Sequence, residues 1–413
     1  MIKLKIFPKR MRYLLIPGNN SLSHVAKCLA IREVLLGKGH ETLIAVNQKH
    51  AQFLKKIEMD HYVLPDIQEI DMSPFPTTAW FKQPMRIIDC IKKEAALLES
   101  YKPNRVLGVF RFTSKASAQL TGIPYDSLIC GCMLAQSTEV LGFSENEAGI
   151  KIQIENLKGF YQYAGTKMSI ALASLGLSKI SDIRCMLKGD RTFLWDFPEF
   201  LPVEKEISII HVGPIKWNHW PHDPIDINKL FNGTRPLAIL TFGTCTISIL
   251  IAKRIITLLL ELGYNVLIAA GGQEELLTIM PDEPRVTALN FAPLQNLFPH
   301  SAMVVCHGGQ MTVFDALYNK IPVVVMPFQP EQAHNGVCLE RIGCGCRLVP
   351  PQPFRQNPWV FIDALNRMSD YEIKSKITNL VNNPQTAIRL AEVKEVLDRY
   401  NGPKALAAML EVG

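Results

Sequence analysis

Short apolar runs rich in β-branched residues alternate along this chain with stretches whose apolar positions recur at helical spacing. In the first half, the pattern predicts strands at 12–16 and 41–46, with a helix at Val25–Lys38 between them. The alternation starts again in the second half, where we expect strands at 237–242, 265–270, 285–289, 303–306 and 323–326. Such alternation is typical of a parallel sheet covered by helices on both faces. The pattern therefore predicts an α/β protein in which this arrangement occurs twice.

The first half continues with a strand at 105–110 and a helix at 115–120, followed by another strand after Gly122-Ile123-Pro124. Between Met72 and Pro84 the chain is rich in proline and aromatic residues, which excludes regular structure. Two interpretations of this segment stay open: a loop that lines a pocket, and a surface loop whose aromatic rings pack locally.

A change of composition divides the chain into domains. With 413 residues the chain is too long for one hydrophobic core. Residues 213–236 are rich in Pro, Trp, His, Asp and Asn without a helical or strand period, which predicts a linker. We therefore expect an N-terminal domain at 11–212, a C-terminal domain at 237–385, and terminal helices at 386–413 that pack back on the N-terminal domain.

Composition and charge narrow the class of partner. Hydrophobic residues make up 48% of the chain and charged residues 20%, and the net charge of +6 is spread along the sequence. These values predict a globular protein with no nucleic-acid partner. No apolar run reaches the roughly 18 residues of a membrane span and no signal peptide is apparent, so we expect no integral membrane segment and a cytoplasmic location. The ten cysteines lack the spacing of a zinc or redox motif.

Three strand-to-helix junctions carry candidate chemistry, at Pro17–His24, at 243–246 and at His307–Thr312. In open α/β sheets ligands bind at the carboxyl ends of the strands, where loops lead into helix N-termini. Glycines at such a turn let the backbone approach a ligand, and the helix N–H groups favour an anion. Gly243 and Thr244 repeat this pattern on a second strand, with Thr244 or Thr246 as a helix cap. Taken alone, such a junction is more often an ordinary turn, and His307 alone could equally be a buried histidine of the core.

The order and spacing of the whole set resemble a known family. The segment "FAPLQNLFPHSAMVVCHGGQMTVFDALYNKIPVVVMPFQPEQAHNGVCLERIGCGCRL" is similar to the donor-binding signature of GT-B nucleotide-sugar glycosyltransferases, in particular UDP-glycosyltransferases and bacterial macrolide or antibiotic glycosyltransferases. The resemblance extends to "LTFGT", "HVGPI" and "SHVAKCLAIREVLLGKGHE". It implies the GT-B fold, in which two Rossmann-like doubly wound domains face each other across a cleft.

The resemblance assigns donor-binding roles to the second domain. It implies that His307 contacts the donor phosphates together with Gly309, Thr312 and the backbone of Gln310 and Met311. Gly243 and Thr244 supply a second phosphate-binding turn.

The same signature implies how the rest of the donor is held. Phe291 stacks on the base, and Asp315 stands where the family has a Glu that binds the ribose. Leu294 replaces a frequent Gln, as in the bacterial enzymes, some of which use dTDP-sugars. Glu331 and Gln332 match an Asp-Gln pair that binds sugar hydroxyls, since a carboxylate beside an amide can both accept and donate hydrogen bonds.

In the first domain, His24 matches the family's general base, which removes a proton from the acceptor hydroxyl. Two residues depart from the family pattern: Lys27 replaces a proline, and no acid stands near Val109, where the family has an Asp that orients the histidine. Without that carboxylate the base is weaker or its partner comes from elsewhere. A capping or packing role for His24 stays open.

These observations predict an inverting glycosyltransferase that needs no metal or other cofactor and acts as a monomer or dimer. Its partners would be a UDP- or dTDP-hexose donor and a small, lipophilic hydroxyl acceptor bound by residues 72–81, 110–112 and 133–143. Two alternatives stay open: a nucleotide-sugar epimerase on the same fold, and a non-catalytic protein that binds a sugar nucleotide.

Overall fold

The protein, in a computed structural model, forms two compact units. The structure describes residues 10–18, 21–65, 81–220, 225–226, 230–231, 234–243, 245, 247–354 and 360–412. Within these ranges the first unit takes up residues to Thr138, Leu157–Trp217 and the chain from Tyr400, and the second unit takes up Glu139–Asn156 and Asn218–Arg399.

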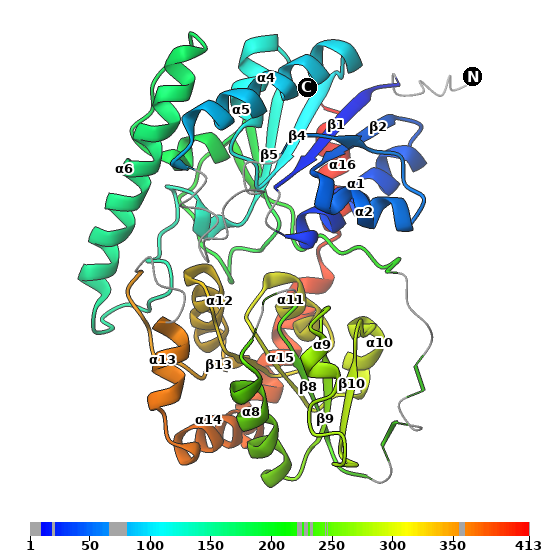
Figure 1. Ribbon diagram of the computed structural model, residues 1–413, viewed down its shortest axis with the longest axis vertical. Helices are drawn as coiled ribbons and strands as arrows, with labels where there is room; N and C mark the ends of the chain where they lie inside the picture. Colours follow the sequence, from blue (N-terminus) through cyan, green and yellow to red (C-terminus); the bar gives the residue numbers. More distant parts are fainter. Residues whose placement is uncertain are drawn as a thin grey trace, which may run out of the picture. The chain divides into compact units, whose positions relative to one another are not determined.

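The first unit is built on a parallel sheet with the strand order β3-β2-β1-β4-β5-β6-β7 (Figure 1). The order runs outward in both directions from the β1 and β4 pair, which defines a doubly wound sheet. Its strands are β1 Arg12–Pro17, β2 Glu41–Val46, β3 Tyr62–Val63, β4 Arg105–Val109, β5 Tyr125–Ile129, β6 Arg191–Leu194 and β7 Ile209–His211. Its helices are α1 Leu22–Gly37, α2 Gln48–Lys56, α4 Pro84–Tyr101, α5 Ser114–Thr121, α6 Ile150–Ser174 (shared with the second unit) and α16 Gly402–Leu410, with short 3₁₀ turns at Gly131–Met133 and Ile183–Leu187.

Helix α1 begins three residues earlier than the predicted start at Val25. Ser21 is the reason, because its extended backbone and its side chain, which accepts from the N–H of Ser23, cap the helix before Leu22. As a consequence, His24 lies in the first turn of α1 and not on a loop.

The second unit repeats the doubly wound topology, with the strand order β10-β9-β8-β11-β12-β13 and all neighbours parallel. Its strands are β8 Leu237–Thr241, β9 Asn265–Ala269, β10 Val286–Leu289, β11 Met303–Cys306, β12 Val323–Val325 and β13 Gly345–Arg347. Its helices are α8 Ile249–Glu261, α9 Glu274–Leu277, α10 Leu294–Leu297, α11 Gln310–Tyr318, α12 Pro330–Arg341, α13 Val360–Arg367, α14 Asp370–Asn382 and α15 Pro384–Asp398, with a 3₁₀ turn at Phe298–His300. Helix α8 neighbours α9 and α14, whereas α11 neighbours α12 and α15.

The division into units differs from the predicted boundaries in two places. Residues 139–156, which the sequence pattern assigned to the N-terminal domain, belong to the second unit. Of the predicted terminal helices at 386–413, α15 belongs to the second unit and α16 to the first. The segment Met72–Pro84 lies mostly outside the described residues, and α4 begins at its last residue.

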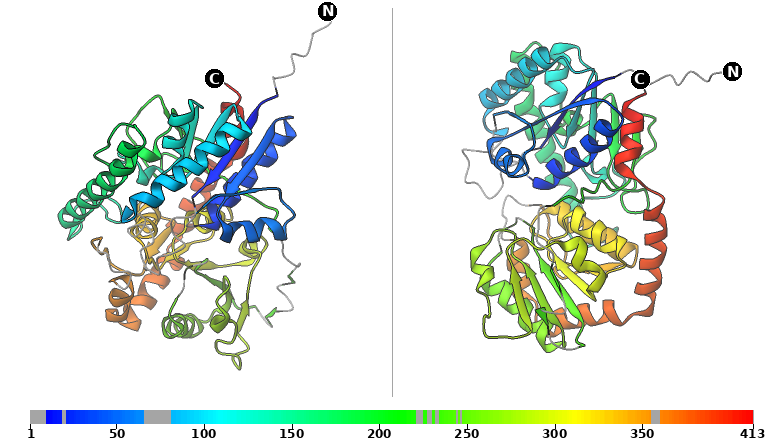
Figure 2. Two further views of the ribbon diagram at one scale, coloured as in Figure 1. Left: turned by 45° about the horizontal axis from the view of Figure 1, so that its top comes forward. Right: turned by 90° about the vertical axis from the view of Figure 1, so that its right-hand side faces the viewer.

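Helix α16 packs beside α1 in the first unit, as Figure 2 shows. The Tyr13 hydroxyl donates to the carbonyl of Leu410 at 3.2 Å, and Arg191 donates to the carbonyl of Met409 at 2.7 Å. Gly213 has a φ of +82°, and a Cβ there would lie 2.4 Å from the ring of Tyr400. The close approach at a left-handed backbone position explains why glycine is required at 213.

A buried ion pair holds the turn that follows β4. The Glu94 carboxylate on α4 is fully buried and accepts from Arg111 Nε at 2.9 Å. Thr113 donates to one carboxylate oxygen of Glu94, and Ser114 and Ser117 donate to the other. A buried carboxylate is tolerated only when its lone pairs are used in this way.

None of the helices that the structure describes has the length and hydropathy needed to cross a bilayer.

We predict that Glu94→Gln lowers the free energy of unfolding by about 3 kcal/mol or more, because it leaves the Arg111 charge buried without its counterion. The matched control is Glu99→Gln on the exposed face of the same helix, which should change the free energy of unfolding by less than about 0.5 kcal/mol. Calorimetric or denaturant unfolding of both variants checks the difference. Equal stability of the two variants would show that the Glu94 network is not a structural element.

Candidate donor-binding and acceptor sites

The turn between β11 and α11 presents an open helix N-terminus. Gly309 occupies the cap position of α11 with φ −65° and ψ 132°, and a glycine has no side chain with which to cap the helix. The N–H groups at the start of an α-helix have no acceptor in a preceding helical turn, and here they belong to Gln310, Met311 and Thr312. Such N–H groups together with the helix dipole make this turn suited to a phosphate.

His307 is held between two glycines at this turn. A Cβ on Gly309 would lie 2.4 Å from His307 Nε2, and a Cβ on Gly243 would lie 3.1 Å from Cε1 of the same ring. Burial lowers the pKa of His307 to about 4, against a smaller opposing effect of a backbone hydrogen bond at Thr241. The imidazole is therefore neutral near pH 7 and acts as a hydrogen-bonding group and not as a cation.

The first turns of α12 pack directly against this turn. Gly308 has a φ of +87°, and a Cβ there would lie 2.7 Å from the backbone oxygen of Gln332. Asn335 donates from Nδ2 to the Gly308 carbonyl at 2.8 Å and to Glu331 Oε1 at 3.1 Å. The structure thus brings the phosphate-type turn and the Glu331–Gln332 pair together, which is the juxtaposition that the sequence pattern required.

The Gln332 amide is already engaged within the unit. Its Oε1 accepts from the N–H of Phe328 at 2.9 Å, and its Nε2 donates to Cys245 Sγ at 3.7 Å. Gln332 is buried, whereas Glu331 is half-buried. Glu331 is consequently the more exposed member of the pair.

The remaining predicted donor residues differ in exposure. Phe291, just after β10, is 67% exposed, which leaves its ring face accessible for stacking. Asp315 is buried within α11; burial raises the pKa of Tyr318 to about 12, and the Asp398 and then the Asp315 carboxylates add to this shift. Gln310 is also buried, whereas Met311 and Thr312 are half-buried. Leu294 is the first residue of α10.

The turn after β8 is described only in part. Gly243 has a φ of +58°, and Thr244 and Thr246 lie outside the described residues. The expectation that one of these threonines caps the following helix is wrong, because α8 begins at Ile249 with Ser248 at the cap position.

Two polar residues at these turns escaped the sequence analysis. Gln273, just before α9, is joined to the loop before α8. Its Oε1 accepts from the N–H of Ile247 at 2.9 Å, and its Nε2 donates to the carbonyl of Cys245 at 2.8 Å. Asn335 was detectable, because it lies four residues after Glu331 and so on the same face of one helix.

His24 occupies an aromatic site in the first unit. Its ring stacks on Phe110 with centroids 5.2 Å apart and lies 5.7 Å from the ring of Trp195. The buried Lys27, one turn further along α1, places its ammonium 4.4 Å from the centroid of Trp195. Three rings and one cation therefore share this site.

The protonation state of His24 follows from these surroundings. Burial and then the Lys27 ammonium lower the pKa of His24 to about 3, against an opposing backbone hydrogen bond at Gly18. Among the described residues, no carboxylate contributes to this shift. The ring is neutral near pH 7, and the carboxylate that was missing from the sequence near Val109 is not replaced by another described residue.

The aromatic residues expected around an acceptor are largely internal. Phe81, Phe112 and Phe143 are buried, and the rings of Phe81 and Phe112 meet edge to face at 5.6 Å. Phe143 belongs to the second unit. The described rings therefore form packing clusters.

Comparison with known proteins matches this architecture to one class of enzyme. Residues 250–350 match the family model of the glycosyltransferase family 28 C-terminal domain. A PGL/p-HBAD biosynthesis rhamnosyltransferase of Mycobacterium bovis (strain BCG / Pasteur 1173P2) is 23% identical over 352 residues, which cover 82% of this chain and 77% of that protein.

Solved structures of the same class match along nearly the whole chain. The glycotransferase of kitacinnamycin superposes with a TM-score of 0.74 at 16% identity, covering 98% of this chain and 99% of that one. The glycosyltransferase VinC in complex with dTDP gives a TM-score of 0.68 at 15% identity, covering 96% of this chain and 98% of that one.

The two doubly wound parallel α/β units and these similarities define a glycosyltransferase of the GT-B fold. The family model, the relatives and the solved structures are all glycosyltransferases, in agreement with the resemblance seen in the sequence.

We predict that buried neutral histidines make the protein acid-sensitive. His24 and His334 each have a folded-state pKa lowered to about 3, mainly by burial. In the unfolded chain these histidines bind protons below about pH 6.5, whereas in the folded chain they stay neutral. The free energy of unfolding therefore has its full value above that pH and falls as the pH decreases toward the folded-state pKa. Each histidine should reduce the free energy of unfolding by about 1 kcal/mol between pH 6 and pH 5.

Denaturant unfolding at pH 6 and pH 5 tests this prediction. His334→Asn should lose about 1 kcal/mol less than the wild type over this interval, because one titrating group is gone. The exposed His300→Asn is the matched control and should behave as the wild type does. An unchanged pH dependence in His334→Asn would contradict the assignment of a neutral buried ring.

Proposed function

We propose that this glycosyltransferase is inverting and metal-independent, and that it transfers a hexose from a nucleoside diphosphate sugar to a hydroxyl of a small lipophilic acceptor. One observation carries the proposal: the glycine turn that leads into α11 lies against the first turn of α12, where the Glu331 side chain is half-buried. A diphosphate and its sugar need these two kinds of group next to each other.

The diphosphate would be bound without a cation from the protein at this turn. The N–H groups of Gln310, Met311 and Thr312 and the neutral imidazole of His307 donate hydrogen bonds, and the helix dipole favours the negative charge. The same groups would stabilise the leaving diphosphate as negative charge develops on it. The exposed ring of Phe291 is the proposed platform for the base.

The proposed reaction is a single displacement. The acceptor oxygen forms a bond to the anomeric carbon while the bond from that carbon to the diphosphate oxygen breaks, so the configuration inverts. His24 takes the hydroxyl proton, and the nucleoside diphosphate leaves. Because its pKa is lowered, His24 is in the proton-accepting form at every pH near neutrality, although it is a weaker base than an ordinary histidine.

The names of similar proteins support a proposal for the class of sugar donor. One relative is named a rhamnosyltransferase, and another, 31% identical over 87 residues, is a demethyllactenocin mycarosyltransferase of Streptomyces fradiae. VinC was solved with dTDP. We therefore propose a dTDP-activated 6-deoxyhexose, with dTDP-rhamnose as the first donor to test.

We predict that dTDP and dTDP-rhamnose raise the melting temperature of the wild type more than UDP- or GDP-sugars do, because a ligand that binds the folded state stabilises it by linkage. Gly309→Ala should abolish the shift with dTDP, since the added methyl displaces the His307 ring from its place 2.4 Å away. Gly159→Ala on the exposed face of α6 is the control, because nothing lies within 4 Å of its Cβ position. No shift with any of these nucleotides would sink the donor proposal.

We predict that His24→Ala lowers kcat about 100-fold or more while binding of dTDP is unchanged, because a general base contributes on that order. In the wild type, the acid limb of kcat/KM should lie well below pH 6.5, as burial and Lys27 lower the pKa of His24. Lys27→Met removes a positive charge that disfavours protonation, so the limb should move to higher pH. The measurement is net transfer of sugar to an alcohol.

The same assay separates the proposal from its alternatives. Rearranged nucleotide sugar without an acceptor product would indicate an epimerase. Full activity in His24→Ala would show that His24 is a packing residue, and donor binding without any turnover by the wild type would indicate a non-catalytic protein.

A further inference from the structure

Helix α12 is held on a second side by a segment that is distant in sequence. The segment Glu139–Asn156, which follows β5 and enters α6, belongs to the second unit. Glu147 pairs with Arg347 at 2.7 Å, Arg341 pairs with Glu139 at 2.9 Å, and Asn156 donates to the carbonyl of Phe354 at 2.8 Å. These contacts anchor the segment at both ends.

The middle of the segment contacts the turn that carries Glu331. Gly142 has a φ of +84°, and a Cβ there would lie 3.4 Å from the carbonyl oxygen of Pro330 and 3.7 Å from the Cβ of Ala333. The N–H of Gly142 donates to His334 Nδ1 at 3.3 Å. One glycine therefore contacts the first turn of α12 through its backbone and the second turn through His334.

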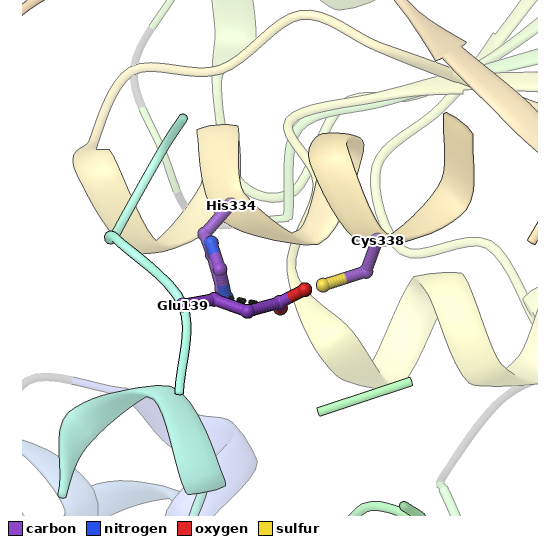
Figure 3. Close-up of side chains that lie close together, drawn as sticks. All are labelled: Glu139, His334 and Cys338. Atoms are coloured by element: carbon purple, nitrogen blue, oxygen red, sulfur yellow. Dashed lines mark ion pairs between the residues drawn. The ribbon is translucent and has the colours of Figure 1, made fainter. Parts of the chain in front are cut away.

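His334 is fully buried at this contact, and its second ring nitrogen faces a carboxylate. Because Nδ1 accepts a hydrogen bond, the neutral ring carries its proton on Nε2, which lies 3.5 Å from Glu139 Oε2. Figure 3 shows His334 and Cys338 projecting from one face of α12 toward Glu139. The ring is thus placed between two parts of the same segment, Gly142 and Glu139.

The same three side chains have the composition of a metal site, and their ligand atoms lie within 4.8 Å of one another. The surroundings of His334 do not favour a cation there. The ring nitrogen that faces the cluster carries a proton and has no lone pair to offer. The charges of Arg341 and Arg347 also act on His334, and they oppose a further cation.

We infer that His334 is a positioning residue for the donor sugar: by joining the segment Glu139–Asn156 to α12, it fixes the helical turn that presents Glu331 and Gln332. On a neighbouring side of the helix, Asn335 joins that turn to Gly308 at the phosphate-type turn. With both sides fixed, the distance between the sugar-binding carboxylate and the phosphate-binding amides is set. This inference rests on the proposed function for its ligand, but the packing that it describes does not.

The test compares sugar and nucleotide binding in three variants. His334→Phe fills the site without either nitrogen, His334→Asn keeps an acceptor for Gly142, and His300→Asn is the exposed control. We expect His334→Phe to raise the KM for dTDP-rhamnose about 5- to 10-fold, as for loss of one hydrogen bond, while the Kd for dTDP changes less than 2-fold. His334→Asn and the control should stay within about 2-fold of the wild type in both constants.

Hydrogen exchange gives a readout that needs no ligand. In His334→Phe, the amides of residues 140–143 and of the first turn of α12 should exchange faster, and those of α11 should not change. Should this variant fail to fold, His334→Leu, which also lacks both ring nitrogens, takes its place.

The outcomes separate the two proposals. Equal weakening of dTDP and dTDP-rhamnose, or unchanged exchange in both segments, would overturn the positioning role. Failure of the wild type to bind any nucleotide would overturn the proposed function and leave the exchange experiment to decide on His334. One equivalent of metal in the purified wild type, lost in both His334→Phe and Cys338→Ser, would show that the cluster is a metal site instead.

Discussion

The close contact between two backbone turns, at Gly308 and at the first turn of α12, is the constraint on which the donor site depends. A side chain at 308 would collide with the backbone oxygen of Gln332, and the positive φ of that residue independently requires glycine. The contact is possible because β11 and β12 are adjacent and parallel, so both turns leave the sheet at the same edge. Strand order therefore decides that an anion-binding helix end and a carboxylate lie side by side.

The same two turns must also leave their ligand-binding groups accessible, while hydrogen bonds to other parts of the unit hold the turns in place. Internal hydrogen bonds do the fixing: Asn335 binds the Gly308 carbonyl, Gln332 binds the N–H of Phe328, and His334 binds the N–H of Gly142. At the cap position of α11 stands Gly309, which has no side chain to make such a bond. A preorganised site needs this division, because groups that are fixed before binding lose little freedom when the ligand arrives.

Sequence reasoning could predict the local features of this arrangement. The apolar runs at 237–242 and 303–306 are buried on both faces in parallel strands, and such runs are recognisable without any partner. Glycines at 243, 308 and 309 mark turns for the same local reason. The pattern missed β3, β6, β7 and β13, because Tyr62–Val63, Arg191–Leu194, Ile209–His211 and Gly345–Arg347 are too short to show a period.

Features that depend on distant residues could not be predicted. Glu94 gives no sign in the sequence that Arg111 and three hydroxyl groups will surround it, since the pairing requires α4 to pack against the turn after β4. The assignment of 139–156 to the second unit depends on ion pairs with Arg341 and Arg347, which lie about 200 positions later in the chain. Neither periodicity nor composition carries such information.

In three histidines of this protein, burial keeps the ring neutral. His24, His307 and His334 sit in different elements, and burial is the largest cause of the lowered pKa in each case. Burial makes each ring a neutral hydrogen-bonding group, since ionising it would require transfer of a charge out of water. Under the proposed function this has a kinetic consequence, because a diphosphate held by neutral donors and a helix dipole, without a fixed cation at the turn, is released more readily than one held by an ion pair. A transferase must discharge its nucleoside diphosphate in every cycle, so a site built from neutral donors favours turnover over retention of the product.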